Sequence, residues 1–163
     1  MLPELQSELL AALRLAGAFL LALPLGYDRE VEDRSAGLRT FPLVAMTSCA
    51  FVLVGLMAFA NESSMAHVAK GVIGGLGFLG GGAILKNGGN VQGMATAASL
   101  WCAGALGVAC AFDLWILAVC LAAANFGVLF FGRQAKKNID ALDDPGKGIQ
   151  EANETSEESD SQD

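Results

Sequence analysis

Long runs of apolar residues, each close to 20 residues, constrain this chain more than any other feature. Five such runs occur, at residues 9–27, 41–60, 68–85, 94–112 and 114–132. Arg14 interrupts the first of them. About 20 apolar residues in a helix cross the hydrocarbon core of a bilayer, where the backbone must satisfy its own hydrogen bonds. The sequence therefore predicts an all-α polytopic transmembrane bundle of about five helices, and it argues against a soluble enzyme.

The basic residues are distributed unequally between the two sides of this predicted bundle. Eight of the ten fall in segments that alternate to the same side: Arg29, Arg34, Arg39, Lys86, Arg133, Lys136, Lys137 and Lys147. The N-terminus and the loops of the other side carry acids but no bases. Because positively charged loops stay in the cytoplasm, we expect the N-terminus outside and the C-terminus in the cytoplasm.

The C-terminal segment differs from the rest in composition. From Asn138 to the end the chain has nine acids, one base and few apolar residues. Such a segment buries too little surface to offset the entropy lost on ordering. We therefore expect a transmembrane domain at residues 1–137, followed by a disordered acidic cytoplasmic tail at 138–163.

Seven glycines lie within twelve residues of the third run, from Gly71 to Gly82. Gly75 to Gly80 match the GxGxxG spacing of dinucleotide-binding loops. No strand precedes this motif, and no acid follows about 20 residues later. The interior of an apolar helix is thus the better interpretation, and no cofactor is predicted.

Two pairs of these glycines have the small-xxx-small spacing of closely packed membrane helices, Gly71/Gly75 and Gly77/Gly81. The fourth run has small residues at the same spacing: Ala95, Ser99, Ala103 and Gly107. We therefore predict that the third and fourth helices approach closely. The alternative is that the glycines let the third helix open, so that its carbonyl groups face an ion.

Two groups of charges are candidates for function. Arg14 lies inside the first run, where it either reaches the outer headgroups or has a buried role, with Asp113 as a conceivable partner. The second group is a polar cluster between the first two runs: Asp28, Arg29, Glu30, Arg34, Arg39 and Thr40. It is either a solvated, self-paired helix end, with Glu30 and Arg34 at helical ion-pair spacing, or a site whose carboxylates hold a hard cation.

Other chemistry finds little support in the sequence. Four cysteines lie inside apolar runs without metal-ligand spacing and are interpreted as small buried hydrophobes: Cys49, Cys102, Cys110 and Cys120. His67 is a lone histidine. The chain has no catalytic set, and no basic patch suited to nucleic acid. The identity of any bound metal is left open.

Three blocks, in order, resemble the hallmarks of the MgtC/SapB family. They are Gly26-Tyr-Asp-Arg-Glu30 with Ser35-Ala-Gly-Leu-Arg-Thr-Phe-Pro-Leu-Val44, then Gly74–Leu85, then Gly93–Trp101. Arg14 falls where the family often has a basic residue, and Asp28 replaces a family glutamate. The resemblance covers about residues 9–132 and implies a short, SapB-like member that lacks the C-terminal ACT-like domain of longer members.

The resemblance also implies a location and a role. It implies a multi-pass protein of the bacterial inner membrane, associated with magnesium homeostasis, that regulates other membrane proteins such as the F-type ATP synthase or a transporter. A homo-oligomer is compatible with its small-residue helix faces. The alternative is a magnesium transporter or channel, which would want acids inside the spans, and the acids here lie at span ends or in loops.

Overall fold

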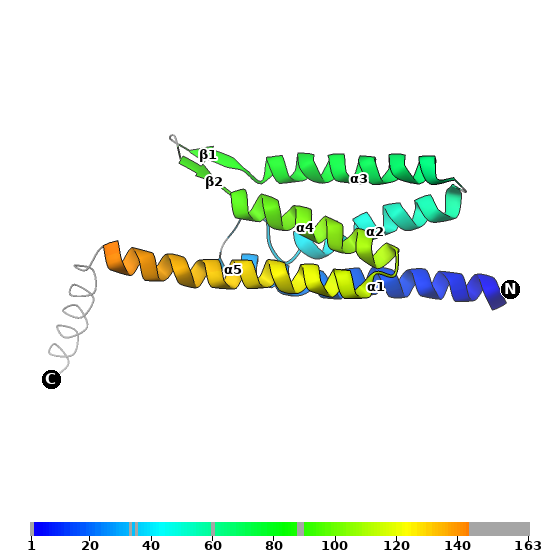
Figure 1. The fold of residues 1–163 in the computed structure, drawn as a ribbon, viewed down its shortest axis with the longest axis horizontal. Helices are drawn as coiled ribbons and strands as arrows, with labels where there is room; N and C mark the ends of the chain where they lie inside the picture. Colours follow the sequence, from blue (N-terminus) through cyan, green and yellow to red (C-terminus); the bar gives the residue numbers. More distant parts are fainter. Residues whose placement is uncertain (1, 33, 35, 60, 88–89, 144–163) are drawn as a thin grey trace. The chain divides into compact units, whose positions relative to one another are not determined.

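Five helices account for most of the protein in a computed structural model that describes residues 2–32, 34, 36–59, 61–87 and 90–143 (Figure 1). They are α1 Leu2–Val31, α2 Thr40–Ala58, α3 Glu62–Gly82, α4 Met94–Ala111 and α5 Trp115–Asp143. An antiparallel hairpin, β1 Leu85–Asn87 and β2 Asn90–Gln92, joins α3 to α4. The predicted helical membrane fold is confirmed.

Four of the described helices, α1, α2, α4 and α5, are long and apolar enough to cross a membrane. α3 falls short of that criterion although its length is sufficient. It begins at Glu62 and includes Lys70 and seven glycines, and the apolar residues Ile84 and Leu85 at the end of the predicted run lie beyond the helix. α3 is therefore a helix of the bundle with less apolar surface than a typical span.

The chain forms two compact units, Met1–Gly127 and Val128–Asp163, which divide within α5. In the first unit α2 and α4 contact each other along most of their lengths. α1 packs against both of them from one side, and α3 contacts both from the other, as Figure 1 shows. α2 and α4 thus form the middle layer of this unit.

The core of the first unit consists of two clusters of apolar side chains. One cluster is dominated by small residues from α1, α2 and α4, which include Ala18, Ala22, Ala45, Cys49 and Cys110, all without exposed surface. The other has larger side chains and includes Leu25, Phe41 and Leu100. Small side chains let helix backbones approach closely in a membrane, and a side chain added at Gly107 would collide with the backbone of Ala45.

The second unit is described as far as Asp143, where α5 ends. Phe130 and Phe131 contact each other edge to face there, with ring centroids 5.7 Å apart. The helix continues to Asp143 and so includes the first six residues of the segment 138–163, for which the sequence predicts disorder. The rest of the predicted tail, residues 144–163, lies outside the described residues.

Candidate functional site

The last turn of α1 and the loop before α2 are held together by two glycines and one glutamate. A side chain at Gly26 would lie 2.9 Å from Cα of Leu38, so the two backbones are in contact here. The Glu30 carboxylate accepts a hydrogen bond of 2.9 Å from the Leu38 amide and occupies the space that a side chain at Gly37 would need. These contacts explain why glycine occurs at positions 26 and 37 and glutamate at position 30.

Beside this contact lies a buried group of charges. Asp28 and Arg29 are 5% and 4% exposed. Arg29 donates to Oδ2 of Asp28 through Nε at 3.1 Å and Nη2 at 2.5 Å, and its Nη2 lies 3.3 Å from Oε2 of Glu32. Arg34 lies 3.3 Å from the same Glu32 oxygen. A buried guanidinium thus has carboxylates on both sides, which offsets much of the cost of its desolvation.

The predicted polar cluster is therefore only partly brought together. Asp28 and Arg29 are buried in it, but the predicted pair of Glu30 with Arg34 is wrong, because α1 ends at Val31 and helical spacing no longer applies. The sequence analysis missed Glu32, although its position three residues after Arg29 is a spacing at which helical ion pairs form.

Arg39 and Thr40 occupy the start of α2, outside this buried group. The amide of Thr40 donates to the carbonyl of Gly37 at 3.0 Å, which begins the helix. Arg39 is exposed at the N-cap position, and its side chain makes no ion pair with any described residue. The cluster therefore presents one open guanidinium next to a set of mutually paired charges.

At the opposite end of the bundle Arg14 is paired with Asp113. The Nε atom of Arg14 donates to Oδ1 of Asp113 at 2.8 Å, and Nη2 contacts Oδ2. Asp113 has a φ of +58° in the α4–α5 turn, a conformation that aspartate tolerates better than most residues. The first residue of α5 also contacts α1, since a side chain added at Gly17 would lie 2.5 Å from the ring of Trp115.

The two charged groups lie closer together along α1 than a bilayer is thick. Fourteen residues separate Arg14 from Asp28, which is about 21 Å of helix, against about 30 Å of hydrocarbon. At least one of the two ion pairs is then inside the hydrocarbon region in a membrane of ordinary thickness. Pairing each charge with its opposite is the usual way to place such groups there.

The described residues contain no group of three histidine, cysteine, aspartate or glutamate side chains placed to hold a metal ion. Asp28 and Glu32 both bind Arg29, so their oxygens already have a cationic partner. His67 is exposed on α3. Of the cysteines, Cys49 and Cys110 belong to the apolar core, and Cys102 donates to the carbonyl of Leu121 at 3.6 Å.

The structure reveals a polar contact inside the membrane region that the sequence analysis missed. Ser99 of α4 donates to Oδ1 of Asn125 of α5 at 3.0 Å, and Nδ2 of Asn125 donates to the Ser99 carbonyl at 3.4 Å. Asn125 is a polar side chain within an otherwise apolar run, and that is the signal that could have identified it.

The predicted packing glycines do not make the contact between α3 and α4. Outside its own stretch of helix, no described atom lies within 4 Å of the position that a side chain at Gly71, Gly75, Gly77 or Gly81 would occupy. The two helices do meet, at Leu76, which contacts Gly104, and at Gly80, where a side chain would lie 3.5 Å from the Ala97 carbonyl oxygen.

The predicted small-residue stripe on α4 faces several helices instead of one. Ser99 contacts α5, and Gly107 contacts α2. Positions four residues apart advance 400° in a helix of 3.6 residues per turn, so such a stripe rotates by about 40° at each step.

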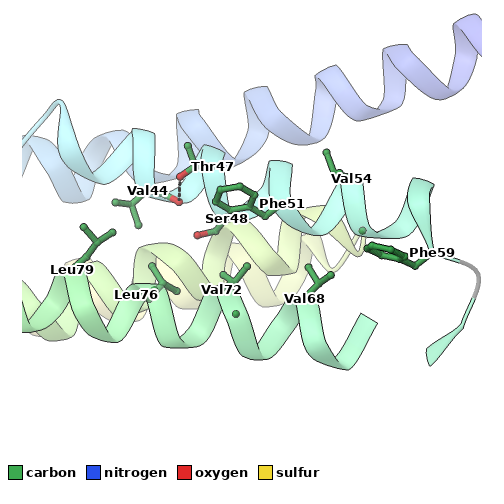
Figure 2. Close-up of a pocket in the computed structure, with 13 residues that line it drawn as sticks. Val44, Thr47, Ser48, Phe51, Val54, Phe59, Val68, Val72, Leu76 and Leu79 are labelled. Atoms are coloured by element: carbon green, nitrogen blue, oxygen red, sulfur yellow. Dashed lines mark hydrogen bonds between the residues drawn. The ribbon is translucent and has the colours of Figure 1, made fainter. Parts of the chain in front are cut away.

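α2 and α3 diverge to leave a groove of about 630 Å³ between them. Side chains from the two helices point toward each other across it in Figure 2. Its walls are mainly apolar, with Thr47 and Ser48 of α2 as the hydroxyl groups and Gly71 and Gly75 of α3 as bare backbone.

Comparison with known proteins decides the family. A model of the MgtC family matches residues 15–138. The chain belongs to the MgtC family. The motif residues described above, from Gly26 to Thr40, all lie within the matched part.

The chain spans less than half the length of the curated relatives that it matches. Protein MgtC of Brucella abortus (strain 2308) is 47% identical over 100 residues, which is 61% of this chain and 42% of that protein. An uncharacterized protein of Synechocystis is 44% identical over 66% of this chain and 45% of its own length. Protein MgtC of Salmonella typhimurium (strain LT2) is 41% identical over 60% and 42%. The matched part is thus less than half of each relative, and no solved structure matches the chain.

Proposed function

We propose that this member of the MgtC family is a homeostatic factor of the bacterial inner membrane that supports growth when magnesium is scarce. In this proposal it acts by contact with other membrane proteins and does not itself conduct ions. Family membership supports the link to magnesium. The packing of the bundle supports the choice of contact over conduction.

The main observation that favours contact over ion conduction is the apolar packing between α1, α2 and α4. The apolar residues buried where these helices meet are alanine, cysteine, valine and leucine, most of them with no exposed surface. A dehydrated Mg²⁺ needs oxygen ligands, and a hydrated one needs a polar path. The apolar core provides neither, and the buried hydroxyl groups of α2 and α4, which belong to Ser48, Thr96 and Ser99, are fewer than the ligands of an octahedral Mg²⁺ shell.

Two ion pairs of the first unit lie toward its two ends. Arg14 binds Asp113 at one end, and Asp28 binds Arg29 at the other. A conduction path would need carboxylates that are open to the ion. The exposed Arg39 instead offers a surface on which another membrane protein can dock.

The experiment that tests the proposal is magnesium flux into liposomes that contain the purified full-length protein. We expect the influx to equal that of empty liposomes, with folding verified by circular dichroism of the same sample. Influx above the empty liposomes that falls in the Arg39→Ala variant would overturn the proposal and identify a transporter.

Contact with other membrane proteins is tested by cross-linking in cells grown at low magnesium. A photoreactive residue at Arg39 should capture a specific inner-membrane protein. The same residue at Ile116, which is exposed on α5, is the control. Identical products at both positions would indicate random collision and contradict the proposal.

A further inference from the structure

The groove between α2 and α3 extends along most of the length of α2. A second hollow of about 270 Å³ lies against the start of α2 and shares Val44 and Leu79 with the first. Together the two hollows reach from Thr40 to Phe59. No side chain of the described bundle fills them, so in a membrane another molecule does.

The length of the groove distinguishes between possible occupants. The nineteen residues of α2, from Thr40 to Ala58, correspond to about 28 Å, close to the roughly 30 Å thickness of the hydrocarbon core. A lipid tail covers only its own leaflet, about half of that distance. A membrane-spanning helix matches the whole groove.

Ser48 on the α2 wall also favours a helix over hydrocarbon. This residue is 4% exposed, and its hydroxyl makes no hydrogen bond with any described residue. In Figure 2 the side chain extends from α2 into the space toward α3. The neighbouring Thr47 differs, because it donates to the carbonyls of Leu43 and Val44. A lipid tail offers Ser48 no acceptor, whereas another helix brings polar groups.

The opposite wall is the glycine-rich side of α3. Gly71 and Gly75 line the groove, and within this chain a side chain at either position would meet open space. Glycine destabilises a helix relative to alanine, and these two positions gain no packing from the described bundle in return. In membranes, glycines at this spacing permit the close approach of two helices.

We propose that the groove receives α3 of a second copy of this chain, so that the protein is a symmetric dimer in the membrane. A close helix crossing needs small residues on both partners, and α3 supplies the same glycine face to each. Such a self-complementary surface is what a two-fold axis requires. The proposal goes beyond the proposed function and does not depend on it.

The size of the contact is sufficient for a specific dimer. A helix about 28 Å long and 10 Å wide has roughly 900 Å² of lateral surface. Half of that surface and the facing wall of the groove come to about 900 Å². The contact of α3 with α2 occurs twice across the two-fold axis, and the contact of α3 with α3 occurs once. The total therefore exceeds the roughly 1,000 Å² that a specific interface buries.

Photo-cross-linking of the purified full-length protein in liposomes tests the position of the interface. Phe78 of α3 and Ile116 of α5 are both 84% exposed, so a photoreactive residue at each has equal access to its surroundings. We expect cross-linked dimers from position 78 and lipid adducts from position 116. Lipid adducts alone at position 78, or equal dimer yields at both positions, would overturn the proposal.

The Gly75→Leu substitution tests the same interface by affinity. No described atom obstructs a side chain there, so the monomer keeps its fold. Single-molecule photobleaching in liposomes should show dimerisation weakened roughly tenfold. Gly127→Leu, on α5 and also without neighbours within 4 Å, should leave it unchanged. Equal dimer fractions in the wild type and Gly75→Leu, or monomers in the wild type, would refute the dimer.

Discussion

At the scale of single residues, the glycines of the bundle fall into two groups. At Gly26, Gly104 and Gly107 a side chain would collide with a neighbouring segment, whereas at Gly71 and Gly127 it would meet open space among the described residues. The first group sets the distance between helices. The second has no such role within the chain.

This division predicts opposite effects of the same substitution. Gly26→Ala places a methyl group 2.9 Å from Cα of Leu38, and overpacking of this kind costs about 1–3 kcal/mol. Gly127→Ala is the matched control, and it should stabilise the protein by up to about 1 kcal/mol through helix propensity. Reversible unfolding in mixed detergent micelles measures both. A Gly26→Ala variant as stable as the wild type would contradict the close approach of α1 and the loop.

The pair of Arg14 and Asp113 gives a second prediction at this scale. Their side chains are 22% and 51% exposed, so the interaction is weaker than a fully buried pair and stronger than a surface one. We expect a coupling free energy of about 1–2 kcal/mol from a double-mutant cycle with Arg14→Leu and Asp113→Asn. Additive effects of the two substitutions would show that Arg14 instead reaches the headgroups on its own.

At this scale the sequence does not reveal which side chains bind each other. It identifies Arg14 and Asp28 as unusual because charges near a bilayer are costly. It misassigns Glu30, whose carboxylate binds the Leu38 amide in a loop of irregular backbone. Helical spacing predicts pairs only while the helix continues, and α1 ends at Val31.

At the scale of elements, α5 is attached to α4 by few contacts, and Asn125 makes two of the hydrogen bonds, beside the one from Cys102 to the Leu121 carbonyl. Asn125→Ala removes both hydrogen bonds to Ser99, and interhelical bonds of this kind contribute about 1 kcal/mol in membrane proteins. We expect the unfolding free energy to fall by that amount. Ala123→Leu, on an exposed part of α5, is the control and should change little. A larger loss with Ala123→Leu would mean that α5 packs through another face.

The helices themselves were predictable, because hydropathy and length specify a membrane span without knowledge of its neighbours. Which face of a helix meets which neighbour was not. The stripe from Ala95 to Gly107 indicates that α4 packs closely, but the rotation of a four-residue repeat distributes its members over α2 and α5. The hairpin β1–β2 was missed because its polar residues resemble those of a simple turn.

At the scale of the whole molecule, an apolar centre separates two charged ends of different character. The end with Arg14 carries one ion pair, whereas the end with Asp28 carries a buried group of charges beside the exposed Arg39. The end of the first unit with more of the described ion pairs is therefore the end that the charge distribution predicts to be cytoplasmic.

The part of the protein needed for function can be tested by growth at low magnesium, in a bacterial strain that lacks its own MgtC-family protein. We expect Arg39→Ala to impair growth more than removal of residues 144–163, a cut that leaves α5 intact to Asp143. Arg39 is exposed and unpaired among the described residues, so its loss should not unfold the protein, and equal membrane levels on immunoblots verify this. Asp28→Asn should also impair growth, but there the buried Arg29 loses a partner and about 3–5 kcal/mol of stability is at risk. Normal growth with Arg39→Ala, together with failure of the truncated protein, would place the function in the acidic tail instead of the cluster.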